Sequence, residues 1–338
     1  MRNKQSFQVI QSAIITFMSI ISNCTTSAIQ DAAASLIAGN LVAFPTETVY
    51  GLGADACNKE AVARIYEVKG RPTDHPLIVH ISSVKLLDKW AREIPEYAIK
   101  LARQFWPGPM TLVLPRTTIA EDFITGGQDT VAIRVPLHAL ANQFLKEFES
   151  LGGFGVAAPS ANRFGKVSPT NSEAVEEELG KFLLGNDQIL NGGQSQIGIE
   201  STIIDCTGEM PRVLRPGSVT LEMVENLLGQ KIGKLDLGRI DIKISGSFET
   251  HYSPNAHVVL NGITSPGDGF IALVEIPTPT GAIRLASPKN NIDYAQILYS
   301  ALRLADSKEI KTINVITPAE QGIGIAINNR LVKASKNL

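Results

Sequence analysis

The chain has 338 residues, of which 44% are hydrophobic and 19% are charged, an ordinary composition for a globular protein. Its 31 Lys and Arg against 33 Asp and Glu give a net charge of −2, which excludes a broad basic field for non-specific nucleic-acid binding. The length exceeds that of one ordinary domain, so we expect two.

An apolar run at residues 7–21 follows Arg2 and Lys4 and superficially resembles a short signal peptide. Two glutamines and a serine interrupt it, and no stretch of the chain reaches the ~18 to 20 apolar residues needed to span a bilayer. We interpret residues 1–26 as an N-terminal extension or the product of an upstream start codon, with a cleaved signal as the alternative.

Three cysteines, Cys24, Cys57 and Cys206, lie far apart in the sequence and form no C-x-x-C pair. An odd, scattered set argues against a disulfide framework and against a thiolate zinc site. A reducing cytoplasm is the expected compartment.

Segments with helical and strand-like patterns alternate from residue 27 onward. The helical segments 27–39 and 59–70 end on glycine, a typical C-terminal cap, and the strand-like segments are almost continuously apolar. In chain order we predict helix 27–39, strand 41–44, helix 59–70, strand 77–81, helix 94–106, strands 110–115 and 130–136, helix 138–148, strand 155–160, apolar segments 201–208 and 212–220, and helix 221–229. The order predicts an α/β fold with a twisted mixed sheet and helices on both faces.

A polar, glycine-rich stretch then separates this part from a second unit. We predict four regions: an extension (1–26), a catalytic domain (27–229), a linker (230–257) and a small C-terminal α/β, Rossmann-like domain (258–338). Within the last region we expect strands 258–263, 269–276 and 312–318, helix 293–307, and a final helix after the glycines at 322 and 324. This unit is either a lid, a docking module or a stabilising module.

Common catalytic signatures are missing from the sequence. The stretch "GLGADA" (51–56) matches G-x-G-x-x-A, but it does not directly follow the first strand, so we interpret it as a turn. The chain has no G-x-x-x-x-G-K-[ST], G-x-S-x-G or H-E-x-x-H motif, and its five histidines lack zinc spacing. We therefore expect no protein-held metal.

Cations, hydroxyls and amides instead gather at the predicted strand ends. Lys69 and Arg71 flank Gly70 just before strand 77–81, and Arg134 lies in strand 130–136. Each polar residue of this kind also has a purely structural explanation. A threonine can cap a turn, a strand arginine can point outward, and His80 can be a core histidine. Ligands of open α/β sheets bind at strand carboxyl ends, and such groups suit phosphate and carboxylate oxygens. The full set predicts an anion site: Thr46, Thr48, Lys69, Arg71, Arg134, Ser160, Asn162, Ser168, Ser201, Thr202 and Arg215.

Seven ordered blocks over about residues 27–220 resemble the YrdC-like threonylcarbamoyl-AMP synthases. They are "FPTETVYGLGADA", "KGRPTDHPLIVHI", "FWPGPMTLVL", "VAIRVP", "VAAPSANRFGKVSPT", "GIESTIID" and "VLRPGS". "HYSPNA" and the small second unit resemble the two-domain form, whose linker returns across the catalytic cavity.

The resemblance implies an activity: L-threonine, bicarbonate and ATP give threonylcarbamoyl-adenylate and pyrophosphate, for N6-threonylcarbamoyladenosine in tRNAs that read codons starting with A. Mg²⁺ would travel with the ATP phosphates. It also implies a downstream threonylcarbamoyl-transferase complex as partner, with weak tRNA contact and no membrane.

Site roles also follow from the resemblance. Lys69 and Arg71 form its K-x-R pair and Ser160 and Asn162 its S-x-N pair, which are the expected catalytic groups. The implied ATP contacts are Arg71, His75, Thr130, Ser160, Ser168, Arg215 and Tyr252. The implied threonine contacts are Thr48, His80, Arg134, Ala158 and Ser201. We expect Lys69 and Arg71 to be exposed and to add little to stability.

Two other functions stay open at this point. The first is an RNA-binding protein that grips tRNA or double-stranded RNA with the same cationic cavity, which the net charge of −2 weakens. The second is a carbamoyl-transfer maturation protein, which would need acylphosphatase and zinc-finger segments that the sequence lacks.

Overall fold

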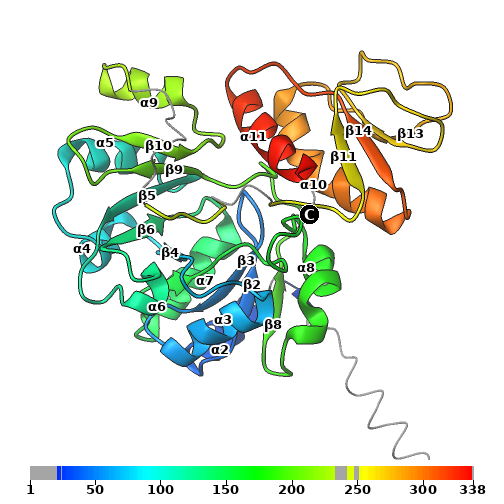
Figure 1. Cartoon of the computed structure of the whole chain (residues 1–338). Coiled ribbons are helices and arrows are strands. Elements are labelled where there is room, and N and C mark those ends of the chain that lie inside the picture. The colour runs from blue at the N-terminus through cyan, green and yellow to red at the C-terminus, as the bar shows by residue number, and fades with distance from the viewer. Residues whose placement is uncertain (1–20, 24, 233–241, 247–250, 337–338) are drawn as a thin grey trace, which may run out of the picture.

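The computed structural model describes residues 21–23, 25–232, 242–246 and 251–336. Most of the apolar run at 7–21, Cys24 and parts of the predicted linker lie outside the described residues. Two β-sheets organise the rest (Figure 1).

A ten-stranded mixed sheet forms the larger unit, in the order β1-β8-β2-β3-β7-β4-β6-β5-β9-β10. Parallel pairs such as β4 with β6 alternate with antiparallel pairs such as β5 with β6, so the predicted mixed sheet is confirmed. β1 pairs with β8, so the predicted extension contributes an edge strand to this sheet. The strands are β1 (Ile21–Asn23), β2 (Val42–Phe44), β3 (Gly51–Asp55), β4 (Ile78–His80), β5 (Met110–Pro115), β6 (Thr130–Arg134), β7 (Val156–Ala157), β8 (Gln188–Asn191), β9 (Thr202–Asp205) and β10 (Arg212–Arg215).

Helices cover the sheet, and α2, α3, α8 and α9 begin at a polar cap. The Thr25 hydroxyl accepts from the amide of Ala28 at the start of α2, and the Asn58 amide oxygen accepts from the amide of Ala61 at the start of α3. Gly70 ends α3 at φ 60°, a left-handed conformation that glycine adopts without strain. The helices are α2 (Thr26–Ile37), α3 (Lys59–Lys69), α4 (Leu87–Trp90), α5 (Glu96–Phe105), α6 (Asp122–Thr125), α7 (Ala139–Ser150), α8 (Ser172–Leu179) and α9 (Leu221–Leu228).

Side-chain alternation assigns each strand residue to one face of the sheet, because successive residues of a strand point to opposite sides. Ile133 is the register partner of both Val79 and Leu112, and all three side chains point to one face of the sheet, into the main core. Ile78 and Val113 point to the opposite face. On that second face, α2 and α7 cover β2 and β7 through a separate apolar cluster.

The remaining half of the second face, over β4, β5, β6 and β9, meets the linker. Ile244 packs there on Ile78, Val113 and Ile203. His80 and Arg134 share the parity of Ile78 and of Ala132, so their side chains emerge on this same half. The linker and these polar side chains therefore cover this half of the sheet, where no helix of the described residues does.

The C-terminal unit is a four-stranded parallel sheet with order β11-β14-β12-β13. It contains β11 (His257–Leu260), β12 (Gly269–Ile271), β13 (Ile283–Ala286), α10 (Asn291–Ser307), β14 (Thr312–Val315) and α11 (Ile323–Ser335). Figure 1 shows α10 and α11 on the side that faces the larger unit. Val49, Val167 and Ile199 of the larger unit pack into its core, so the two units share apolar surface.

Most predicted elements are confirmed within a few residues, and the interpretation of 51–56 as a turn is wrong. Residues Gly51–Asp55 form β3 between β2 and β7. A Cβ on Gly53 would lie 2.8 Å from Val156 Cγ1 and 3.0 Å from the carbonyl oxygen of Val42, so the glycine serves close strand packing. The prediction also lacked β1, β8, β13, α4, α6 and α8. No helix in the described ranges is long and apolar enough to cross a membrane.

Candidate active site

A cavity lies where β4 and β6 end, on the half of the sheet that faces the linker. Residues from the β2–β3 connection, the strand ends, the loops beside β9 and β10, and the linker all line it. The cavity has a volume of about 40 Å³, which is small for a ligand site. Of the predicted site residues, it is lined by Thr46, Thr48, His80, Arg134, Ala158, Ser160, Ser201, Arg215 and Tyr252.

Arg134 forms one end of this cavity. Its guanidinium group lies 2.7 Å from Glu47 Oε1 and donates to Thr48 Oγ1 at 2.8 Å. Thr46 Oγ1 lies 2.8 Å from Thr48 Oγ1, so the β2–β3 connection is tied into one network. All of these side chains are buried, and Arg134 Nε has no hydrogen-bond partner among the described residues. With Nη1 on Thr48 and Nη2 on Glu47, the Nε–H group is the guanidinium donor left without a partner in the described part of the chain.

His80 lies beside Arg134 at the end of β4. Burial, reinforced by the charge of Arg134, lowers the pKa of His80 to about 3, so the ring is neutral at pH 7. Its Nδ1 lies 3.2 Å from the carbonyl oxygen of Ile78. A neutral ring does not add to the positive charge of Arg134.

Arg215 forms the opposite end of the cavity. It donates from Nε and Nη2 to the carbonyl oxygen of Ser201 at 3.1 and 2.9 Å, and from Nη2 to Ser201 Oγ at 3.1 Å. Its Nη1 donates to the carbonyl oxygen of Ser245 in the linker at 2.9 Å. The linker closes this end with Gly246, His251 and Tyr252.

Lys69 and Arg71 are buried, with exposed fractions of 2% and 6%, so the expectation that they are exposed is wrong. Lys69 Nζ donates to the carbonyl oxygens of Ser160 and Asn162, the former at 2.6 Å. Burial, followed by the charge of Arg71, lowers the pKa of Lys69. Lys69 therefore holds the S-x-N loop in place, and its substitution would also cost stability.

Arg71 lies just behind the cavity. It donates to the carbonyl oxygen of Pro76 at 3.0 Å, and its guanidinium carbon lies 5.9 Å from the ring centroid of Phe164. Burial lowers the pKa of Arg71 to about 10, with smaller effects from Tyr252 and Arg215. Arg71 and Arg215 therefore lie close enough for the charge of one to affect the other.

Four predicted residues surround the cavity without lining it. The Asn162 side-chain amide donates to two loop carbonyls, and Ser168 Oγ donates to Glu200 Oε1 at 2.7 Å. His75 contacts Phe164 edge to face. Thr130 lines a neighbouring apolar hollow beside Ile244.

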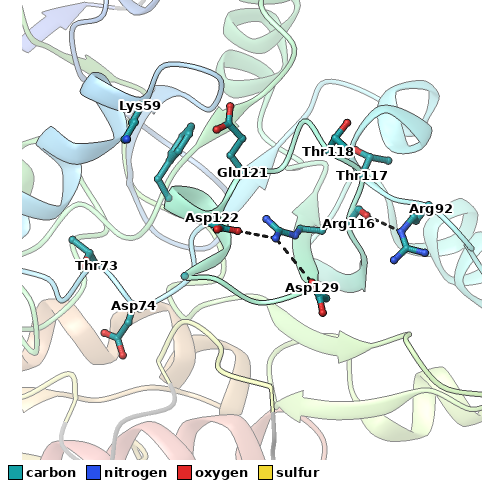
Figure 2. A pocket seen from close by; sticks show the side chains of 12 residues that line it. Lys59, Thr73, Asp74, Arg92, Arg116, Thr117, Thr118, Glu121, Asp122 and Asp129 are labelled. Atoms are coloured by element: carbon teal, nitrogen blue, oxygen red, sulfur yellow. Dashed lines mark hydrogen bonds and ion pairs between the residues drawn. The ribbon is translucent and has the colours of Figure 1, made fainter.

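A larger pocket of about 890 Å³ opens elsewhere, against α6 (Figure 2). Arg116 lies between two carboxylates in it, 2.7 Å from Asp122 and 4.0 Å from Asp129. Its lining includes none of the predicted site residues, so size alone does not locate the site. Within the described ranges no group of three or more His, Cys, Asp or Glu is placed to hold a metal.

Comparison with known proteins shows the family of this chain. Residues 34–217 match the Sua5/YciO/YrdC family model, described as "Telomere recombination", and residues 219–336 match the model of the "Threonylcarbamoyl-AMP synthase, C-terminal domain". The chain belongs to the Sua5/YciO/YrdC family. Its two units are those of the two-domain form.

Relatives within this family cover nearly the whole chain. The threonylcarbamoyl-AMP synthase of Pyrococcus abyssi is 42% identical over 328 residues, covering 91% of this chain and 94% of that protein. The Bacillus subtilis enzyme of the same name is 39% identical, covering 91% and 92%. The structure of P. abyssi Sua5 complexed with L-threonine has a TM-score of 0.83 at 38% identity, covering 93% of this chain and 97% of that one.

Two acidic residues of the family blocks escaped prediction from the sequence, Glu47 in "FPTETVYG" and Glu200 in "GIESTIID". Glu47 faces Arg134, and Glu200 receives hydrogen bonds from Ser168, Tyr299 and Arg330. A signal existed, because a buried cation needs a counter-charge nearby. The C-terminal residues Tyr299 and Arg330 had no comparable local signal.

Proposed function

We propose that this cavity makes threonylcarbamoyl-AMP from L-threonine, bicarbonate and ATP, with release of pyrophosphate. The observation that carries the proposal is that Arg134 and Arg215 line one cavity together with the hydroxyls of Thr48, Ser160 and Ser201. The identity to threonylcarbamoyl-AMP synthases over nine-tenths of the chain supports the same reaction.

The threonine end is the part around Arg134. A guanidinium charge suits a carboxylate, and Arg134 keeps its Nε–H group unpaired while Glu47 and Thr48 hold the other two nitrogens. The threonine nitrogen forms a bond to the bicarbonate carbon and water leaves, which yields a carbamate. Ser201 and Ala158 supply a polar and a small apolar contact beside it.

The nucleotide end is the part around Arg215, with Tyr252 and Ser160. The carbamate oxygen attacks the α-phosphorus of ATP, the bond to the β-phosphate oxygen breaks, and pyrophosphate leaves. The carbamate and the ATP phosphates are both anions, so this reaction needs fixed cations that reduce the repulsion between them. Arg71, whose charge acts on Arg215, and Thr130, in the neighbouring hollow beside Ile244, extend this end. Mg²⁺ would arrive on the ATP phosphates.

ATP cannot enter the cavity as it stands, because small-molecule sites measure about 300 to 1,000 Å³ and this space is far smaller. The linker residues 245, 246, 251 and 252 form one wall and must shift for nucleotide to bind. Within the proposal, the linker is the moving part of the site.

The RNA-binding alternative gains no support from this geometry. Lys69, Arg71, Arg134 and Arg215 are all at most 6% exposed, so they cannot contact the phosphates of an RNA surface. A downstream transferase complex, tRNA as the final acceptor and a cytoplasmic location remain expectations from the family.

The test is ATP conversion by the purified chain. We expect pyrophosphate release only when threonine and bicarbonate are both present, with a product of the mass of threonylcarbamoyl-AMP. The Arg134→Gln variant serves as the matched negative control. Pyrophosphate release independent of threonine, or no conversion with all three substrates, would contradict the proposal.

A further inference from the structure

Glu200 is a buried carboxylate at the boundary between the two units. It precedes Ser201 at the start of β9 and is 7% exposed. Ser168 Oγ donates to its Oε1 at 2.7 Å, and the Tyr299 hydroxyl lies 2.9 Å from Oε2. Arg330 Nε donates to Oε2 at 3.0 Å. One carboxylate therefore connects the large unit to both α10 and α11.

Arg330 also contacts the second loop of the nucleotide end. Its Nη1 donates to the carbonyl oxygen of Pro216 at 2.8 Å, directly after Arg215. The side chain is 1% exposed, so these bonds form in a medium where they are strong. Through Glu200 and Pro216, one residue of α11 ties together the loops that carry Ser201 and Arg215.

The same two C-terminal residues support Tyr252 from behind. The Tyr252 ring stacks on Tyr299, with centroids 5.6 Å apart and planes at 23°. The Arg330 guanidinium carbon lies 5.6 Å from the Tyr252 ring centroid. Tyr252 has a φ of 64°, which a non-glycine residue keeps only when its surroundings hold it.

We propose that Arg330 and Tyr299 of the C-terminal unit are positioning residues for nucleotide binding, acting through Glu200 on Ser168 and through direct contact on Tyr252 and the Arg215 loop. The inference rests on the proposed function, because it takes these residues as the ATP contacts. It assigns the second unit a part in building the site. Neither residue touches the cavity, so neither is a catalytic residue.

Charge supports this arrangement. Although burial opposes ionisation, the guanidinium groups of Arg330 and Arg215 and the Ser168 hydroxyl lower the pKa of Glu200 to about 2. The carboxylate is thus ionised at pH 7 and accepts the Ser168 hydroxyl hydrogen, which fixes the direction of that hydroxyl. An altered Arg330 would loosen an anchor that Ser168 and Tyr299 share.

A second ion pair between the units provides the control. Arg303 on α10 lies 3.3 Å from Glu178 on α8 and donates to the carbonyl oxygen of Val167. It joins the same two units but does not line the cavity. The Arg303→Lys variant therefore tests whether docking in general, or the Glu200 contacts in particular, supports nucleotide binding.

The experiment measures ATP binding by calorimetry, and KM for ATP and for threonine, in the full chain. The variants are Arg330→Lys, Tyr299→Phe and Arg303→Lys, each with its melting temperature. We expect Arg330→Lys to weaken ATP binding about tenfold or more, since small misplacements of binding groups have effects of that size. Tyr299→Phe should act in the same direction more weakly, and Arg303→Lys should stay within about twofold of wild type.

Each outcome decides a different claim. Wild-type ATP affinity in a folded Arg330→Lys variant would overturn the inference, as would an equal loss in Arg303→Lys. Should Arg330→Lys fail to fold, Tyr299→Phe decides alone, and unchanged ATP affinity there would overturn the inference. Failure of the wild-type chain to bind ATP would instead refute the proposed function.

Discussion

The two ends of the cavity are built in different ways. The threonine end consists of Arg134, His80 and the 46–48 connection, all attached to strands of one sheet. The nucleotide end combines Arg215, linker residues and supports from the C-terminal unit. The first is part of a continuous core, whereas the second depends on the contact between two units and a linker.

The difference teaches which end can move. Strand ends inside a closely packed sheet change position only at high cost, since such interiors are dense. The linker is held by side-chain donors to its carbonyl oxygens, from Arg215 to Ser245 and from Lys333 to Gly246, and by the packing of Ile244. We therefore expect threonine binding to be preformed and nucleotide binding to require rearrangement, and four predictions test this contrast.

The largest effect should come from Arg134→Gln at the rigid end. We expect kcat/KM for threonine to fall about 100-fold or more, because the carboxylate loses its charged partner. The variant leaves Glu47 buried without its partner, so stability should fall by about 3–5 kcal/mol.

Adding Glu47→Gln to Arg134→Gln should restore much of the stability but none of the threonine use. Denaturant unfolding and steady-state kinetics check the two effects separately. Near-normal threonine use in the single variant would remove Arg134 from the site.

A lower pH should destabilise the folded chain through two buried histidines, His80 at the threonine end and His251 at the nucleotide end. Burial lowers the pKa of His80 and of His251 to about 3, against about 6.5 in the unfolded chain. Below pH 6.5 the unfolded state binds protons that the folded state does not, so stability falls as pH decreases from that point. At pH 5 each histidine should reduce the free energy of unfolding by about 2 kcal/mol.

Chemical denaturation at pH 7 and pH 5 measures that loss. The His251→Asn variant should show a shallower pH dependence, while the His257→Asn variant, altered at an exposed histidine, should match wild type. An identical slope in wild type and His251→Asn would contradict the assignment of a buried neutral ring.

A smaller effect should follow from Gly246→Ala in the linker. Gly246 has φ +82°, and an added Cβ would lie 2.7 Å from the Tyr252 hydroxyl oxygen. The added methyl group would displace Tyr252, a proposed ATP contact, so we expect ATP affinity to fall about tenfold while threonine affinity stays near wild type. Calorimetry with each ligand checks this, with Gly229→Ala, which has positive φ but open space, as control. An equal loss for both ligands would mean that the two ends are not independent.

The smallest effect should come from Lys243→Ala. Lys243 pairs with Asp74 at 2.7 Å on the surface, and the Gln128 side chain also pairs with the Lys243 backbone. Exposed ion pairs contribute little, so ATP affinity should change by no more than about twofold. A larger change in either direction in the same titration would show that this surface pair influences the position of the linker.

Local patterns accounted for many of the helices and strands, because apolar periodicity and caps act over a few residues. The prediction missed β3, because glycines at 51 and 53 suggest a turn. Only the structure shows that Val42 and Val156 approach the backbone of Gly53 closely. For the site, the family blocks led to Arg134, Arg215 and the hydroxyls that line the cavity. They did not show that Lys69 is buried with its ammonium group on loop carbonyls.

The sequence by itself determined the alternation of helices and strands, the mixed sheet and the set of polar groups at strand ends. Each of these depends on residues close together in the chain. Only the tertiary structure decided which counter-charges meet these groups. Arg330 reaches Glu200 across 130 residues, and no local pattern encodes that contact, because it exists only once α11 packs against the larger unit.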